Sequence, residues 1–407
     1  MSVAVGKNVL FIQKKFSEYY RKHGDSVVAP KNLTQREFGF LTLKERVMVR
    51  HKGFPDFQDL IRFIQLTNPS DCYYSSAYYE RPTEDMERKG WLGADLCFDI
   101  DADHIPTDCK RDHDRWTCLD CQSVGKGTSP ENCPSCGSQR FKEEPWFCER
   151  CLEAAKGETL KLIDILGEDL GFSPQEIQVY FSGHRGYHVH VESPSVKDLD
   201  QMARKEIVDY VLGMGLKPMY HGLKGESGPR LEEGGWRTRL MKGVYETLLT
   251  ASDGTLAELG LRRNIADTLV KYKDELLKTW WEGNPWGMVK GMGFKAWEKL
   301  CLKAVERQSA LVDTVVTTDV HRLIRLGGTL HGKTGLSKTS VAPWGLEGFD
   351  PLKASIAFTN GTVRLHIEYA YPFRLGDVHY GPYTDEDEEL PTAAAMLLLC
   401  KGVATLS

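Results

Sequence analysis

Two carboxylates stand two residues apart in the segment Asp99-Ile100-Asp101. In an extended strand, residues i and i+2 project from the same face, so these two side chains would lie side by side. Adjacent carboxylates repel each other unless a cation lies between them, and a divalent metal ion is the usual partner. The pair therefore indicates a metal site. The alternative is a solvent-facing strand edge that ends in a turn at Asp103-His104.

A second segment combines glycine with histidine and arginine, and it reads Ser182-Gly-His-Arg-Gly-Tyr-His-Val-His190. Glycines on both sides of His184 and Arg185 would let backbone N–H groups approach a phosphate closely. The arginine and the imidazoles could add donors to phosphoryl oxygens. The pattern indicates a phosphate-binding turn, and the alternative is a glycine hairpin with surface histidines.

A third segment, 316–333, places one carboxylate, Asp319, close to several cations and to a second glycine-bracketed loop. Asp319 would suit a third metal ligand, while Arg325, His331 and Lys333 would suit contacts to a triphosphate. The alternative is an ordinary amphipathic segment in which the aspartate caps a helix.

Seven of the eleven cysteines fall between residues 109 and 151, mostly in pairs with two residues between them. An odd count with this spacing is typical of metal binding in a reducing compartment rather than of a disulfide framework. With His113, eight ligands make two tetrahedral zinc sites. We favour an inner site of Cys118, Cys121, Cys133 and Cys136, and an outer site of Cys109, His113, Cys148 and Cys151. Neither leaves an open position, so a catalytic zinc is not expected.

The elements that must position these residues follow from apolar periodicity. The spacing predicts helices over 8–24 and about 156–170, and strands over 92–102, 177–181 and 187–191. The cysteine-rich stretch has little apolar periodicity and is predicted to be an inserted module, and the chain from 195 to 310 is predicted to be mostly helical.

The 407 residues suggest two or three domains. A net charge of -5, taken alone, argues against nucleic-acid binding. The charges are unevenly placed, however, because residues 261–307 hold ten Lys or Arg against six Asp or Glu. Part of the acidic excess lies in Asp385–Glu389, which is predicted to be a solvated tail. No signal peptide or bilayer-spanning apolar run is present, so we expect a soluble, intracellular (cytoplasmic) protein with no membrane association.

Taken in order, these segments resemble the catalytic (small) subunit of archaeal/eukaryotic-type DNA primase. The resemblance is carried by Trp91–Asp103, Ser182–His188, Val316–Arg325 and Leu330–Lys333, with further similarity at Arg36–Phe38 and at Tyr73–Tyr79. It covers roughly residues 8–340. Two features depart from the family: Gly327-Gly-Thr329 replaces a proline-containing sequence, and the inner cysteine pairs look like an insertion.

The resemblance implies an α/β (α+β) fold in which antiparallel-containing sheets flanked by helices meet at the acidic site. The catalytic core would comprise 1–108, 152–194 and 311–380. A zinc-binding module (109–151), a mainly helical insertion (195–310) and an acidic C-terminal tail (381–407) would complete the chain.

The resemblance also implies an activity: synthesis of short RNA primers de novo on single-stranded DNA, by two-metal-ion nucleotidyl transfer. Asp99, Asp101 and Asp319 would hold Mg²⁺ or Mn²⁺. The incoming NTP or dNTP would be bound by Ser182, Gly183, His184, Arg185, His188, Arg325, His331 and Lys333. One or two structural Zn²⁺ ions, a large primase subunit in a heterodimer and the replication polymerase machinery are the other implied partners.

Three alternatives stay open. One is a primase-type polymerase that extends strands with dNTPs in repair, and another is a non-catalytic zinc-ribbon adaptor that binds nucleic acid. A glycosyltransferase would account for Asp99-Ile-Asp101 but not for the glycine-histidine segment or the cysteines.

Overall fold

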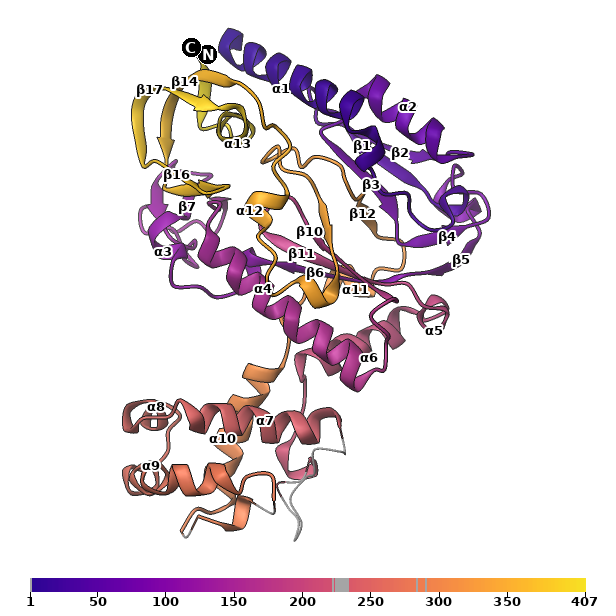
Figure 1. Ribbon diagram of the computed structural model, residues 1–407. Helices are drawn as coiled ribbons and strands as arrows, with labels where there is room; N and C mark the ends of the chain where they lie inside the picture. The colour runs from indigo at the N-terminus through magenta and orange to yellow at the C-terminus, as the bar shows by residue number, and fades with distance from the viewer. Residues whose placement is uncertain (1, 222, 224–233, 283–284, 290) are drawn as a thin grey trace. The chain divides into compact units, whose positions relative to one another are not determined.

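The computed structural model describes residues 2–221, 223, 234–282, 285–289 and 291–407 (Figure 1). These residues form two compact units, each described here by itself. Unit 1 consists of Met1–Thr159, Pro174–Lys205 and Val312–Ser407, and unit 2 of Leu160–Ser173 and Glu206–Leu311. The expected helical insertion at 195–310 includes residues 224–233, which lie outside the described residues.

Two four-stranded antiparallel sheets make up the centre of unit 1. The first has the order β12-β3-β1-β2, with strands Leu323–Arg325, Asp71–Ser75, Phe38–Leu41 and Met48–Lys52. The second has the order β13-β10-β11-β6, with strands Thr339–Val341, Ile177–Phe181, Gly186–Val191 and Leu96–Asp101. The mixed α/β class with antiparallel sheets, as the family resemblance implies, is therefore confirmed.

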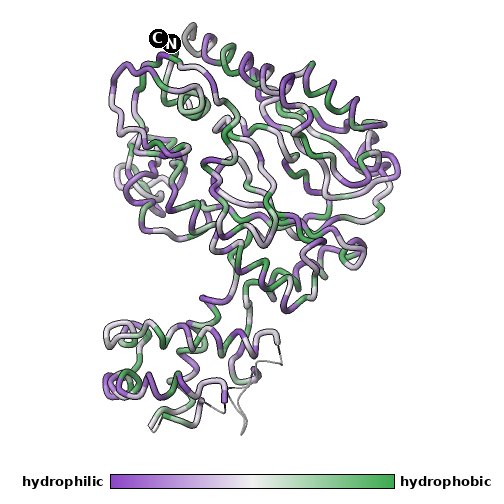
Figure 2. The backbone as a smooth tube through the Cα atoms, viewed as in Figure 1, coloured by the Kyte–Doolittle hydropathy of each residue, from purple (hydrophilic) through white to green (hydrophobic). Residues whose placement is uncertain are grey.

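Helices α1 (Ser2–Lys22) and α2 (Phe57–Thr67) lie beside the first sheet (Figure 1). Hydrophilic and hydrophobic residues alternate along α1 (Figure 2), as expected for a helix with one buried face. Helix α2 begins at an aspartate cap, because the Asp56 carboxylate accepts a hydrogen bond from the Asp59 N–H. Its buried residues are Leu60, Ile61 and Ile64.

The strand expected over 92–102 is broken in two at Asp95. Residues Trp91–Ala94 form β5, which pairs with β4 (Ala77–Tyr79) in a separate two-stranded sheet. Strand β6 begins at Leu96 and pairs with β11 instead. Asp95 is buried, and its carboxylate lies 2.5 Å from Arg36 Nη2 and accepts a hydrogen bond from the Tyr78 hydroxyl. The chain therefore passes from the β4-β5 sheet to the second four-stranded sheet at Asp95, the residue that forms this buried ion pair.

The C-terminal segment is not a free tail. Its acidic run lies in strand β17 (Tyr383–Pro391), which pairs with β14 (Thr362–Ala370). Arg364 stands opposite Glu389, and His366 Nδ1 lies 3.2 Å from Oδ1 of the opposite Asp387. These cross-strand contacts favour a strand that the composition alone disfavours. Helix α13 (Thr392–Lys401) and strand β18 (Ala404–Leu406) follow. The Asn8 side chain then ties the C-terminus to α1 through hydrogen bonds with Ala404 and Leu406.

The cysteine-rich stretch forms a small antiparallel sheet with the order β8-β7-β9. Its strands are Val124–Lys126, Arg115–Cys118 and Phe141–Glu144. Helix α3 (Lys110–His113) precedes this sheet and α4 (Glu149–Asp164) follows it. The remaining short α-helices and strands described in unit 1 are α5 (Pro194–Lys197), α11 (Thr314–Thr318), α12 (Pro351–Ala354), β15 (Phe373–Leu375) and β16 (Val378–Tyr380).

Unit 2 is helical in its described residues. Helix α6 (Gln201–Leu212) leads into it, followed by α7 (Gly235–Leu249), α8 (Asp253–Glu258), α9 (Arg263–Lys278) and α10 (Phe294–Gln308). Three tryptophans, Trp280, Trp286 and Trp297, pack edge-on or tilted at centroid distances of 5.0 to 6.3 Å in its core. None of the described helices is both long and apolar enough to cross a bilayer.

Candidate active site

Strand pairing brings the acidic pair and the histidines together. In the register between β6 and β11, His188 stands directly opposite Asp99 and His190 opposite Cys97. The apolar residues Leu96, Phe98 and Ile100 are buried on the other face of β6. Asp99 and Asp101 consequently share the face that lines a pocket, where His188 Nε2 lies 3.6 Å from Asp99 Oδ1.

The third carboxylate beside this pair is that of Asp313. Its backbone N–H donates to the carbonyl oxygen of Asp99 at 2.8 Å, and its side chain caps α11 by accepting from the Val315 N–H. Burial, followed by the charges of Asp101 and Asp313, raises the pKa of Asp99 to about 7. Asp101 and Asp313 thus add negative charge beside Asp99. Among the described residues no Lys or Arg forms an ion pair with Asp99, and this arrangement suits a divalent cation.

Asp319, the predicted third ligand, follows directly after α11. Its carboxylate accepts a hydrogen bond from the His321 N–H at 2.9 Å. Neither Asp319 nor Asp313 is among the residues that line the pocket, but only the charge of Asp313 is among the main causes of the raised Asp99 pKa. Asp313 lies six residues earlier, outside the segment that drew attention to Asp319. The available signal was its position before Thr314, where an aspartate typically caps a helix.

The turn from Ser182 to Gly186 is stabilised by hydrogen bonds to the side chain of Ser182. The Ser182 hydroxyl accepts from the His184 N–H at 3.2 Å and from the Gly186 N–H at 3.3 Å. Those two N–H groups, expected to face a phosphate, are therefore already bonded. Only glycine fits at position 186, because the Cβ of any other residue would lie 2.0 Å from the Ile100 carbonyl oxygen.

The predicted nucleotide-binding residues divide into two groups. Those that line the pocket are Ser182, His184, His188, Arg325 and His331. Gly183, Arg185 and Lys333 are not among the lining residues. Arg185 is completely buried, with Nη1 2.6 Å from Asp103 Oδ1 and Nη2 3.9 Å from Asp114 Oδ2.

Two stacked imidazoles join the turn to the loop at 327–335. The rings of His184 and His331 are 4.9 Å apart with an interplanar angle of 19°. Burial holds the pKa of both histidines well below the usual 6.5, and nearby positive charges, including Lys333 and Lys401, lower it further. Both are therefore neutral at pH 7 and can donate or accept one hydrogen bond per nitrogen.

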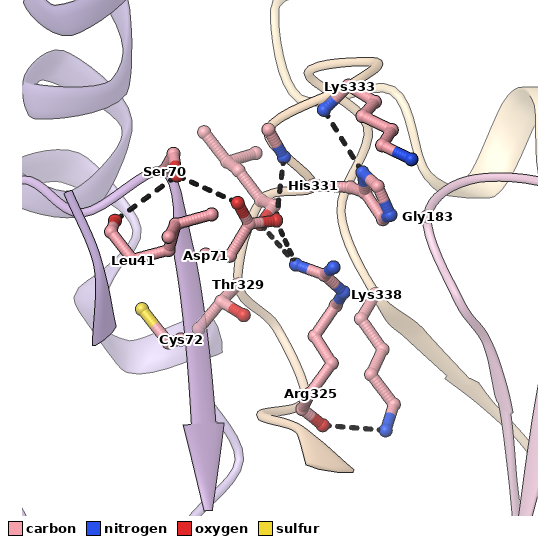
Figure 3. A network of polar contacts seen from close by, with 12 residues as sticks. Leu41, Ser70, Asp71, Cys72, Gly183, Arg325, Thr329, His331, Lys333 and Lys338 are labelled. Atoms are coloured by element: carbon pink, nitrogen blue, oxygen red, sulfur yellow. Dashed lines mark hydrogen bonds and ion pairs between the residues drawn. The ribbon is translucent and has the colours of Figure 1, made fainter. Parts of the chain in front are cut away.

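Two further cationic or imidazole groups of the pocket differ in their partners. His188 Nδ1 has no hydrogen-bond partner among the described residues, and burial holds the pKa of this histidine well below 6.5. Arg325, which is 8% exposed, forms an ion pair with Asp71 (Figure 3). Tyr73 and Arg322 also line the pocket, and Asp71 adjoins it through Arg325. The sequence motifs gave Asp71 and Tyr73 no role, because both contact Arg325 through pairing between strands that are far apart in the chain.

The cysteines and His113 gather into the same two groups that the spacing favours. The outer cluster is Cys109, His113, Cys148 and Cys151, and the inner cluster is Cys118, Cys121, Cys133 and Cys136. Sulfur–sulfur distances of 3.5 to 4.0 Å separate the contacting pairs. Zn–S bonds of about 2.3 Å at tetrahedral angles place sulfurs about 3.8 Å apart, so both donor sets fit zinc.

A carboxylate supports the outer cluster. Asp114 Oδ1 lies 2.7 Å from His113 Nδ1 and accepts from the Trp146 N–H at 2.9 Å, while His113 Nε2 faces the Cys151 sulfur at 3.5 Å. A hydrogen bond at one ring nitrogen commonly orients the other toward a metal. Because Asp114 also faces Arg185, one carboxylate joins the outer cluster to the glycine-histidine turn.

Comparisons with known proteins bear on what this site does. A family model described as DNA primase small subunit matches residues 133–343. The DNA primase small subunit PriS of Nitrosopumilus maritimus is 30% identical, over 98% of this chain and 99% of its own. The PriS proteins of Methanococcoides burtonii and Archaeoglobus fulgidus are 34% and 35% identical, over 98% and 97% of this chain and 98% of their own.

Proposed function

The chain belongs to the DNA primase small-subunit family, and we propose that it is the catalytic subunit that synthesises short RNA primers de novo on single-stranded DNA. The observation that carries this proposal is the pair Asp99 and Asp101 in a pocket that His188 and Arg325 also line. Asp313 is hydrogen-bonded to the Asp99 backbone, and its charge helps to raise the Asp99 pKa. Carboxylates on one side and phosphate-binding donors on the other are what nucleotidyl transfer requires.

In this proposal Asp99, Asp101 and Asp313 hold Mg²⁺ or Mn²⁺, and Asp313 takes the place first assigned to Asp319. When bound, the cations would activate a 3′-hydroxyl and neutralise charge on the phosphates. Asp313 caps α11 through Oδ1, and no described hydrogen bond uses its Oδ2. The rigid pairing of β6 with β11 fixes the other two carboxylates, so the ligands are held before a cation binds.

The chain's own donors would hold the triphosphate. Arg325 supplies a permanent charge, and neutral His184, His188 and His331 supply N–H groups in the same pocket. Lys333 is exposed next to His331 and would meet the phosphates from the solvent side. Arg185, bound between two carboxylates, would instead hold the glycine-histidine turn in place.

We propose that each cysteine cluster binds one structural Zn²⁺. A large primase subunit would be the partner of this chain within the replication polymerase machinery. The basic stretch 261–307 would contact the phosphates of the template. All eleven cysteines are unpaired, which supports a reducing, cytoplasmic setting.

The test is incubation of the chain with single-stranded DNA, labelled NTPs and Mn²⁺, without any primer. We expect short RNA products that disappear in Asp99→Asn, whose fold is checked by circular dichroism. Products formed only from dNTPs on a pre-existing primer would favour a repair polymerase. Calorimetry that detects no Mn²⁺-dependent triphosphate binding would favour the non-catalytic adaptor.

A further inference from the structure

We propose that Asp71 is a positioning residue that holds two parts of the nucleotide pocket, Arg325 and the loop around Gly332, in the geometry that receives a triphosphate. The inference rests on the proposed function. Asp71 does not line the pocket, so it acts through these groups rather than by touching the nucleotide.

Asp71 begins strand β3 and is only 3% exposed. Its Oδ1 accepts hydrogen bonds from Arg325 Nη1 and, at 3.0 Å, from the Gly332 N–H. Its Oδ2 accepts from the Ser70 hydroxyl at 2.7 Å (Figure 3). Both carboxylate oxygens are thus occupied by donors from three places in the chain. This arrangement leaves Asp71 unsuited to bind a metal ion and well suited to join those places.

One of the joined groups is Arg325, one of two arginines that line the pocket. Strand β12 pairs with β3 so that Arg325 stands opposite Tyr73, two residues from Asp71. Arg325 Nη2 lies 3.4 Å from the Tyr73 hydroxyl, and both residues line the pocket. A guanidinium that is 8% exposed needs a compensating charge, and the Asp71 carboxylate supplies it while fixing which nitrogens face the protein.

The other joined group is the loop that carries His331 and Lys333. The Gly332 N–H between them is held by Asp71, and the Lys333 N–H donates to His331 Nδ1 at 3.1 Å. A Cβ at Gly332 would lie 2.7 Å from Asp71 Oδ2 and 3.1 Å from Ser70 Cβ. Glycine at this position is therefore what allows the carboxylate to approach the loop.

The first experiment measures the affinity of the full chain for Mn²⁺·ATP by calorimetry. Asp71→Asn keeps the shape of the side chain but removes its charge, and Arg325→Gln removes the guanidinium. We expect each to weaken binding about tenfold or more, and the double variant to lose less than the product of the two, because Asp71 acts through Arg325. A double variant that loses the full product, or an Asp71→Asn protein with wild-type affinity, would overturn the inference.

A second variant keeps every charge. Gly332→Ala pushes the loop away from Asp71, and we expect about tenfold weaker binding of Mn²⁺·ATP. Gly345→Ala is the matched control, because a Cβ there meets nothing within 4 Å. Gly332→Ala with wild-type affinity would overturn the inference even if Asp71→Asn fails to fold. Absence of Mn²⁺·ATP binding by the wild-type chain would instead overturn the proposed function.

Discussion

Single residues of the site differ in how far the sequence could reveal them. Asp99 and Asp101 were predictable, because the two-residue period of a strand is local. Asp313 was not, since it is placed beside Asp99 by a backbone hydrogen bond between positions that are far apart in the chain. Asp71 was hidden for the same reason, because its partner Arg325 comes from a strand far along the chain.

A buried lysine near the carboxylates gives a pH prediction. Lys338 is 1% exposed, donates to the Arg325 carbonyl oxygen at 2.7 Å, and lies over the Tyr180 ring. Burial lowers its pKa from 10.5 to about 7. Between these values the unfolded chain binds more protons, so this group makes the free energy of unfolding rise with pH. Its cost to stability is largest below pH 7 and disappears as the pH approaches 10.5.

Comparison with Lys338→Met isolates that contribution. From pH 7 to pH 9, the free energy of unfolding of the wild type should rise by about 2 kcal/mol relative to the variant. Urea denaturation at pH 7, 8 and 9 measures the difference. A gap between the two proteins that stays constant with pH would show that Lys338 titrates normally.

Elements were predictable where their pattern is local, and less so where distant charges decide. Strands β10 and β11 lie where periodicity places them. The stretch 92–102 reads as one strand because its alternation continues through Asp95, yet the buried Arg36 ends β5 there. The acidic run reads as a tail because five charges in a row disfavour a strand, but Arg364 and His366 stand opposite two of them.

The two cysteine clusters should differ in what they stabilise. The outer cluster is mostly buried and is tied by Asp114 to Trp146, whose ring packs against Tyr371 and Phe373. The inner cluster has two exposed cysteines and holds only the ribbon of β7 to β9. Loss of the outer site should therefore disturb unit 1, whereas loss of the inner site should disturb the ribbon alone.

Two cysteine-to-serine variants compare these sites directly. Cys151→Ser and Cys121→Ser should each reduce bound zinc from two ions to one, measured by metal analysis. Thermal unfolding should show a loss of about 2–4 kcal/mol for Cys151→Ser and less than about 1 kcal/mol for Cys121→Ser. Equal losses, or a larger loss for Cys121→Ser, would contradict the assignment of the outer site to the core.

At the scale of the whole molecule, the net charge of -5 was a poor guide to partners. Some of the acidic excess is exposed on strand β17, and some is the carboxylate group of Asp99, Asp101 and Asp313 itself. The order of the motifs along the chain was the better guide, because that order is specific for the primase family whereas no single motif is. Relatives that align over nearly the full length carry the same conclusion.

The central claim is that primer synthesis occurs at a site built from Asp99, Asp101 and Asp313. Its most direct test is primer-independent RNA synthesis on single-stranded DNA by the wild type, Asp313→Asn and Asp319→Asn, with equal NTP and Mn²⁺. We predict that Asp313→Asn loses about 100-fold or more in rate, while Asp319→Asn stays within about threefold of the wild type. Wild-type rates in Asp313→Asn, with loss confined to Asp319→Asn, would contradict the account.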